Sequence, residues 1–166
     1  MNSKVLEILK MLEGFRAEAY KDAAGVWSIG FGTTRYMDGS PVQKGDKITK
    51  ADAEILLIKQ FDEFKQNTRR LLPYTLPEDA IDAVTLLVYN IGLGAFTKST
   101  LLKRIKEDVK GFEAIEKEWN RWVYAGKKVL PGLVKRRKDE FQLYKAAVLN
   151  QFTKVECYDL GRASKK

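Results

Sequence analysis

The chain has 166 residues and a hydrophobic fraction of 45%, which suits one domain or one domain with a small lobe. It contains no histidine and a single cysteine, Cys157, which excludes a Ser-His-Asp triad, a Cys-His pair, a His- or Cys-rich zinc site and a disulfide within the chain. The net charge of +8 favours polyanionic partners, namely nucleic acid, anionic lipid or bacterial wall polymer, but charge alone does not choose among them. We expect no cofactor and no metal.

The N-terminal part of the chain changes from a helical to a strand pattern. Apolar residues at helical spacing predict a helix that follows Ser3 and ends near Glu13-Gly14. Residues 27–32 alternate large apolar side chains with serine and glycine, which predicts a strand. Asp38-Gly39-Ser40-Pro41 predicts a turn. A small hairpin or a three-stranded sheet therefore fits residues 15–37.

The remainder predicts helices separated by proline and glycine. Thr49 is expected to cap a long helix that ends before Pro73, with Asp52 completing a capping box. Pro77 opens the next helix, whose residues 80–89 carry little charge and are expected to be buried. Gly92 and Gly94 are expected to stop it. Further helices are predicted from Ser99, across residues 112–122 and from Pro131.

Two carboxylates stand in different local settings near the start of the chain. Glu13 ends the first predicted helix, and Asp22 lies in the turn before the glycine-rich strand. Two carboxyl groups in such different surroundings can differ in pKa, which acid–base chemistry on a glycosidic bond requires. Glu18 matches no catalytic spacing and is interpreted as a surface charge.

These residues carry a resemblance to a known family. Glu13, Asp22 and residue 28 are spaced like the signature of the phage-type lysozymes of the T4 lysozyme family, glycoside hydrolase family 24. Later segments also resemble the family, so that the similarity covers residues 3–147; these segments are residues 45–49, 90–92, 96–102 and 132–137. The chain departs from the family at Ser28, where threonine is usual, and at Thr33, where histidine is common.

The resemblance implies an α+β, mostly helical, lysozyme-like fold, in which a small N-terminal β-hairpin lobe and a larger helical lobe are separated by a cleft. We expect a single lysozyme domain over residues 1–149, with a β insertion at about 15–45. Residues 150–166 are polar and basic and are interpreted as a C-terminal tail.

The resemblance also implies an activity: a peptidoglycan-degrading endolysin that hydrolyses the β-1,4 bond between N-acetylmuramic acid and N-acetylglucosamine with inversion. Glu13 corresponds to the general acid, Asp22 to the group that directs the attacking water or stabilises positive charge on the sugar, and Ser28 to a residue that holds this water. Sugar contacts are expected from residues that share only this resemblance: Thr33, Tyr89, Asn90 and Ser99. The family places an arginine of the last helix near the acid, and either Arg136 or Arg137 can serve.

The expected partner is bacterial cell-wall peptidoglycan, and the expected state is a monomer. We expect no nucleic acid and no stable membrane insertion, because no apolar run approaches the roughly 20 residues of a membrane helix. No signal-peptide pattern opens the chain, so we expect accumulation in the host cytoplasm and release to the wall by a separate membrane-permeabilising (holin) factor.

Several alternatives stay open at this point. A lytic transglycosylase uses a single glutamate and leaves an anhydro-sugar, a basic helical protein can bind nucleic acid, and a wall-binding module needs no catalysis. The basic stretches at residues 127–128 and 135–138 suit either a solvated face or attraction to an anionic surface. Trp27, Trp119 and Trp122 suit either the core or stacking on sugars.

Overall fold

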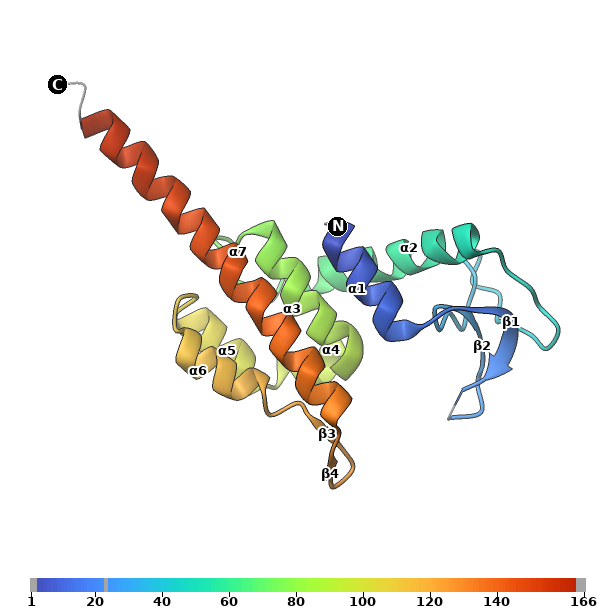
Figure 1. Ribbon diagram of the computed structural model, residues 1–166. Coiled ribbons are helices and arrows are strands. Elements are labelled where there is room, and N and C mark those ends of the chain that lie inside the picture. Colours follow the sequence, from blue (N-terminus) through green and yellow to red (C-terminus); the bar gives the residue numbers. More distant parts are fainter. Residues whose placement is uncertain (1–2, 23, 164–166) are drawn as a thin grey trace. The chain divides into compact units, whose positions relative to one another are not determined.

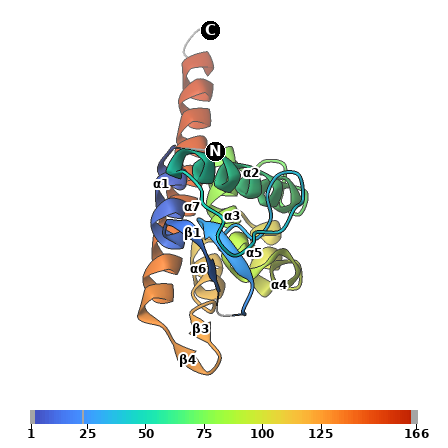
Figure 2. The same ribbon diagram turned by 90° about the vertical axis from the view of Figure 1, so that its right-hand side faces the viewer.

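The computed structural model describes residues 3–22 and 24–163, with their side chains except those of Ala125 and residues 154–163. Contacts within the chain divide it into two compact units: an N-terminal unit up to Glu63 and a C-terminal unit from Phe64. The boundary falls inside helix α2 (Lys50–Arg69). Figure 1 shows the order of the elements along the chain, and Figure 2 shows the same ribbon after a quarter turn.

The N-terminal unit begins with helix α1 (Ser3–Glu13), followed by strands β1 (Arg16–Lys21) and β2 (Trp27–Gly30). The two strands are antiparallel, and Tyr20 is paired with Ser28 in their register. Residues 46–48 add an incomplete third strand, because the Ala19 amide donates to the Asp46 carbonyl and the Ile48 amide to the Ala17 carbonyl, both at 2.9 Å. The predicted hairpin is confirmed, and the additional pairing comes from residues 46–48, outside the range of 15–37 in which a third strand was considered.

Burial along β2 differs from the two-residue alternation of its sequence. Ile29 and Phe31 are buried as expected, but Ser28 and Gly30, on the opposite face, are buried as well. The reason is visible at Gly30, which has a φ of +64° and at which a Cβ atom would lie 2.8 Å from the Cβ of Ala53 in α2. The strand thus approaches α2 so closely that only glycine fits.

The start of α2 agrees with the sequence. The Asp52 amide donates to Thr49 Oγ1 at 3.1 Å, and this hydroxyl donates to Asp52 Oδ2 at 2.7 Å. Such reciprocal bonds satisfy an amide that the helix itself leaves without a partner. The predicted turn at residues 38–41 is also confirmed, since Asp38 Oδ1 accepts hydrogen bonds from the amide and hydroxyl of Ser40.

The C-terminal unit is built around helix α3 (Glu78–Ile91), every residue of which from Ala80 to Val88 is buried, as its apolar sequence predicts. Its main packing partner is helix α7 (Pro131–Ala163), and helix α6 (Phe112–Trp119) also packs on α7. Two short helices complete the bundle, α4 (Leu93–Thr97) and α5 (Thr100–Glu107). Figure 1 shows α3 and α7 side by side, with α5 and α6 beside them.

Three features of this unit differ from the expectation. Gly92 ends α3 as expected, but Gly94 does not stop a helix, because it lies inside α4, which begins at Leu93. The helix expected over residues 112–122 ends at Trp119 and is followed by a hairpin that the sequence did not predict, formed by strands β3 (Tyr124–Ala125) and β4 (Lys128–Val129). Finally, α7 continues to Ala163, so the backbone of the segment interpreted as a tail is helical as far as that residue. The side chain of Cys157 and residues 164–166 lie outside the described part.

Candidate active site

Glu13 is the last residue of α1. The Gly14 amide donates to the Lys10 carbonyl at 3.1 Å, and Gly14 has a φ of +68°, a conformation that glycine adopts without strain and that ends the helix. The chain then turns directly into β1. The end of the helix therefore sets the backbone position of Glu13, and the residue is half-buried.

Asp22 builds the turn between β1 and β2. Its Oδ1 accepts hydrogen bonds from the amides of Ala24 and Val26, both at 2.9 Å, and its carbonyl accepts one from Gly25 at 2.9 Å. The second carboxylate oxygen, Oδ2, accepts no hydrogen bond from any residue that the structure describes. One oxygen thus fixes the orientation of the half-buried carboxylate and leaves the other available to a further partner.

Ser28 and Thr33 lie in the same unit, but both are almost completely buried, with exposed fractions of 2% and 1%. The Ser28 hydroxyl donates to the Val26 carbonyl over 3.5 Å, a weak hydrogen bond that leaves most of its capacity unused. Thr33 pairs with Ile29 through two backbone hydrogen bonds, while its Oγ1 finds no partner among the described residues. Only Ser28 is held beside the turn that Asp22 builds.

Glu18 is the carboxylate of β1 that sequence spacing set aside. It is exposed and forms an ion pair with Lys47 at 2.9 Å. This pair lowers the pKa of Glu18, chiefly through the hydrogen bond from Lys47. A group held in its charged form suits a surface residue, which confirms the interpretation of Glu18 as a surface charge.

Arg136 and Arg137 lie at the buried face of α7 and share one acid, Glu140, which the sequence analysis did not single out. Arg136 Nε donates to Glu140 Oε1 at 2.9 Å, and Arg137 Nη2 donates to the same oxygen at 3.1 Å. The other carboxylate oxygen accepts from the Trp119 indole at 3.2 Å. The spacing of three and four residues between these groups on one helix was the signal that could have revealed the cluster.

Burial dominates the electrostatics of this cluster. Loss of hydration lowers the pKa of Arg137 to about 10, and Glu140 only partly opposes the shift. The same cause raises the pKa of Glu140, against the attraction of both arginines. Within the described residues, Arg137 Nε and Nη1 have no hydrogen-bond partner. Of the four basic residues at positions 135–138, the two lysines are therefore exposed and the two arginines are buried.

The predicted sugar contacts of the C-terminal unit occupy different settings. Asn90 is exposed, and its Oδ1 accepts from Arg137 Nη2 at 2.9 Å, so the arginine orients this amide. Tyr89 is half-buried and packs edge-on against Phe64, with ring centroids 5.1 Å apart. Ser99 caps α5, since its hydroxyl accepts from the Leu102 amide and donates to the Phe96 carbonyl.

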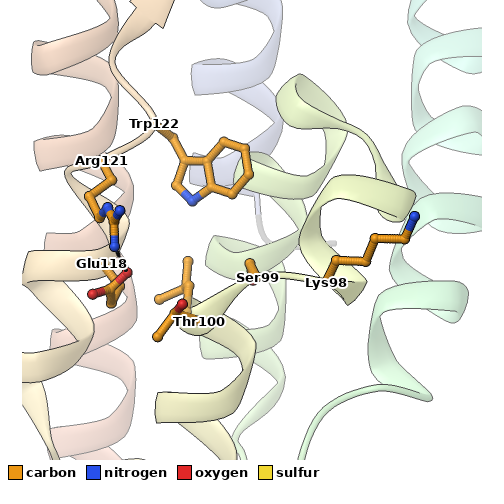
Figure 3. Close-up of a pocket in the computed structure, with 7 residues that line it drawn as sticks. Lys98, Ser99, Thr100, Glu118, Arg121 and Trp122 are labelled. Carbon is orange, nitrogen blue, oxygen red and sulfur yellow. Dashed lines mark hydrogen bonds and ion pairs between the residues drawn. The ribbon is translucent and has the colours of Figure 1, made fainter.

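Ser99 also lines a cavity of about 320 Å³. Figure 3 shows Trp122 beside Ser99 and Thr100, and shows Arg121 reaching Glu118 in an ion pair of 3.0 Å. Trp122 is half-buried here, whereas Trp119 is completely buried in the core. Of these two indoles, only Trp122 therefore has an accessible ring that can stack on a ligand.

The predicted residues are divided between the two units. Glu13, Asp22, Ser28 and Thr33 belong to the N-terminal unit, and the remaining candidates belong to the C-terminal unit. Within the second group, Asn90, Arg137 and Arg136 are joined through hydrogen bonds and Glu140, whereas Ser99 belongs to the separate cavity.

Comparison with known proteins identifies the family of the chain. The phage lysozyme family model matches residues 10–140. The endolysin of Acyrthosiphon pisum secondary endosymbiont phage 1 is 36% identical over 149 residues, which cover 89% of this chain and 99% of that protein.

Two solved structures have a similar fold. The endolysin from Escherichia coli O157:H7 phage FAHEc1 aligns with a TM-score of 0.75 and 33% identity over 86% of this chain and 91% of that chain. The muramidase domain of SpmX from Asticaccaulis excentricus aligns with a TM-score of 0.74 and 26% identity over 86% of this chain and 95% of that chain. These matches confirm the lysozyme-like fold. The chain therefore belongs to the phage lysozyme family and is a glycoside hydrolase.

Proposed function

We propose that the chain hydrolyses the β-1,4 bond between N-acetylmuramic acid and N-acetylglucosamine in peptidoglycan. Its substrate class follows from the family, whose relatives here include endolysins and a muramidase domain. Two carboxyl groups at the family spacing, Glu13 and Asp22, are available for the reaction. We assign Glu13 as the general acid that protonates the leaving glycosidic oxygen and Asp22 as the group that directs the attacking water.

The observation that supports this most is the hydrogen bonding of Asp22. Two backbone amides hold Oδ1, so the carboxylate cannot rotate freely, and Oδ2 keeps its lone pairs for a water molecule. Positioning of this kind is what a water-directing carboxylate needs, because the attacking water must approach the anomeric carbon along one direction. Ser28, with its weakly engaged hydroxyl next to this turn, is proposed to hold the same water.

The proposed reaction is a hydrolysis in which water is the only co-substrate. Glu13 gives its proton to the glycosidic oxygen as the bond to the anomeric carbon breaks. Asp22 orients a water molecule, whose oxygen bonds to the same carbon from the opposite face and whose proton passes to Asp22. This sequence inverts the anomeric configuration, as in enzymes whose two carboxyl groups leave room for a water.

The other candidate residues receive supporting roles. Asn90, with its amide oriented by Arg137, and the exposed parts of Tyr89 are proposed to contact the sugar. Ser99 is proposed to do so through its cavity. Arg136 and Arg137 are proposed to position neighbouring groups, because their buried guanidinium groups are not open to a sugar. Thr33 is buried, so it is proposed to support the sugar site through its backbone pairing with Ile29 and not through direct contact with the sugar.

We further propose that the protein acts in host lysis. It is expected to act as a monomer, to collect in the host cytoplasm and to reach the wall after a separate holin has permeabilised the membrane. Nucleic acid is not proposed as a partner. This part of the proposal rests on the relatives, which are named endolysins, and on the cationic composition, which suits an anionic wall.

Analysis of the products released from purified sacculi tests the reaction type. A hydrolase releases muropeptides with an ordinary reducing end, whereas a lytic transglycosylase releases anhydro-muropeptides that are lighter by one water. We expect reducing muropeptides, and their loss in Glu13→Gln. Anhydro products would replace the proposed hydrolysis by the transglycosylase reaction, and absence of any release by the wild-type chain would contradict both.

A further inference from the structure

The β3–β4 hairpin is a feature that the catalytic proposal leaves without a role. It joins α6 to α7, and Figures 1 and 2 both show it at the N-terminal end of α7, projecting beyond the adjoining helices of the C-terminal unit. A backbone hydrogen bond of 3.0 Å from the Leu130 amide to the Val123 carbonyl closes the base of the hairpin. Because Val123 is buried, the hairpin has a fixed base and an exposed tip.

Four large apolar side chains at this end of the unit are exposed. They are between 41% and 59% accessible and comprise Tyr124, Val129, Leu130 and Val134. Tyr124 and Val129 are register partners, so their side chains lie on the same face of the hairpin. Leu130 and Val134 are one helical turn apart, since the Val134 amide donates to the Leu130 carbonyl at 3.1 Å. Single exposed apolar residues are ordinary, but these four lie within eleven consecutive positions, and Val129 and Leu130 are adjacent in the chain, so we treat the two pairs as one apolar patch.

Two positive charges lie on the same hairpin. Lys127 lies in the turn of the hairpin, and Lys128 is the first residue of β4, on the face opposite to Tyr124 and Val129. Both lysines are exposed and have no ion-pair partner in the part of the chain that the structure describes. Helix α7 starts at Pro131 with no acidic residue in its first turn, so the positive end of its dipole is not neutralised. The hairpin and the start of the helix that follows it therefore both carry positive charge.

We infer that the β3–β4 hairpin is a docking surface for a bilayer that contains anionic phospholipid. Aliphatic side chains gain free energy in the interfacial zone of a bilayer but little on a hydrated glycan or polyphosphate. Lysines beside them are attracted to anionic headgroups. The helices that the structure describes include none with the length and apolarity needed to cross a bilayer, so this contact is peripheral and reversible. The inference does not depend on the roles assigned to Glu13 and Asp22.

Co-sedimentation of the whole chain with lipid vesicles tests this inference. At low salt, we expect binding to vesicles that contain phosphatidylglycerol and much weaker binding to pure phosphatidylcholine. Lys127→Gln combined with Lys128→Gln is expected to weaken binding roughly thirtyfold, since each lysine near an anionic surface contributes about fivefold. The matched control is Lys44→Gln combined with Lys59→Gln, which removes the same charge from two exposed lysines of the N-terminal unit and is expected to change binding little.

A second double variant distinguishes insertion of apolar side chains into the bilayer from a purely ionic contact. Val129→Ser combined with Val134→Ser leaves the charge intact and is expected to reduce binding about tenfold or more, in proportion to the apolar area lost. Every variant is also assayed on lipid-free sacculi, where unchanged hydrolysis shows that it is folded and that the hairpin is not part of the catalytic site. Equal loss of binding in the test and control lysine pairs, unchanged binding in the valine variant, or impaired sacculus hydrolysis in the Lys127 and Lys128 variant each overturns the inference.

Discussion

Asp22 and Val26 close the turn between β1 and β2 through two hydrogen bonds of 2.9 Å, one from the Asp22 amide to the Val26 carbonyl and one from the Val26 amide to Asp22 Oδ1. The carboxylate that we propose to direct the water is therefore also the group that builds its own turn. A single side chain can serve both purposes because it has two oxygens. One is used by the fold, and the other remains for the substrate water.

Substitution of Asp22 separates these two purposes. Asp22→Asn keeps an oxygen that can accept both amides, so we expect the free energy of unfolding to change by less than about 0.5 kcal/mol. The turnover rate is expected to fall about a hundredfold or more, because an amide cannot take the proton of the water. Asp22→Ala loses the turn bonds as well and should cost about 1 kcal/mol in addition. Turbidity clearing and chemical denaturation measure the two effects.

Asp38 offers a matched control for that experiment. It builds the turn at residues 38–41 in the same way, through Oδ1 bonds to Ser40, and is given no catalytic role. Asp38→Asn should retain wild-type activity and stability. A wild-type rate in Asp22→Asn, with the same stability, would remove Asp22 from the mechanism.

Glu13→Gln should abolish the clearing of permeabilised bacterial cells while leaving the protein at least as stable as the wild type, because catalytic carboxylates often reduce stability. Glu18→Gln is the control: Glu18 follows Glu13 by five residues but is exposed and paired with Lys47. It should clear cells at the wild-type rate. Equal loss of activity in both variants would mean that general loss of charge, and not proton donation by Glu13, explains the effect.

Substitutions of Ser28 test whether catalysis needs a hydroxyl group beside the turn that Asp22 builds. Ser28→Thr should keep most of the activity, although the buried position makes the added methyl group cost about 1 kcal/mol of stability. Ser28→Ala removes the hydroxyl with little change in volume and should lower the rate more than Ser28→Thr does. Steady-state kinetics on sacculi, normalised to the folded fraction, rank the variants. An Ala variant faster than the Thr variant argues against a role in holding water.

Gly30→Ala should be strongly destabilising. The new Cβ would lie 2.8 Å from Ala53 Cβ, and the residue has a φ of +64°. We expect a loss of more than about 2 kcal/mol from overpacking and backbone strain together. Gly39→Ala is a control for strain alone, since Gly39 has a φ of +84° but no atom lies within 4 Å of its would-be Cβ. Its loss should be smaller, and equal losses in urea denaturation would show that contact with Ala53 is unimportant.

Glu140→Gln should destabilise the C-terminal unit by about 3 kcal/mol, because it removes the carboxylate that pairs with buried Arg137 and also accepts from Arg136. The neighbouring Asp139→Asn breaks an exposed ion pair with Lys135 and should cost less than about 1 kcal/mol. Thermal and chemical denaturation of both variants measure the difference. Similar stabilities would show that Glu140 is not the principal partner of Arg136 and Arg137.

The local patterns of the sequence were sufficient for much of this fold. The Thr49 capping box, the turn at Asp38 and the buried helix over residues 80–89 depend on neighbours along the chain, and all three are present. Glu13 and Asp22 could be singled out for the same reason, since their setting is also local. The resemblance to a known family then supplied the roles proposed for them.

Features that depend on distant contacts could not be predicted. The burial of both faces of β2 depends on its approach to Ala53, and the burial of Arg136 and Arg137 depends on packing against α3 and on the indole of Trp119. A charged stretch such as residues 135–138 looks the same in sequence whether it is solvated or internal. The β3–β4 hairpin has strands of only two residues, too short for a recognisable alternation.

The stereochemistry of the bond cleavage tests the central claim most directly. Proton NMR of a chitooligosaccharide or muropeptide substrate, recorded in the first moments of digestion, identifies the anomer that is released before mutarotation. With Glu13 as acid and a water directed by Asp22, the β-glycoside should yield the α-anomer first. Initial release of the β-anomer, or of an anhydro end, would contradict the account.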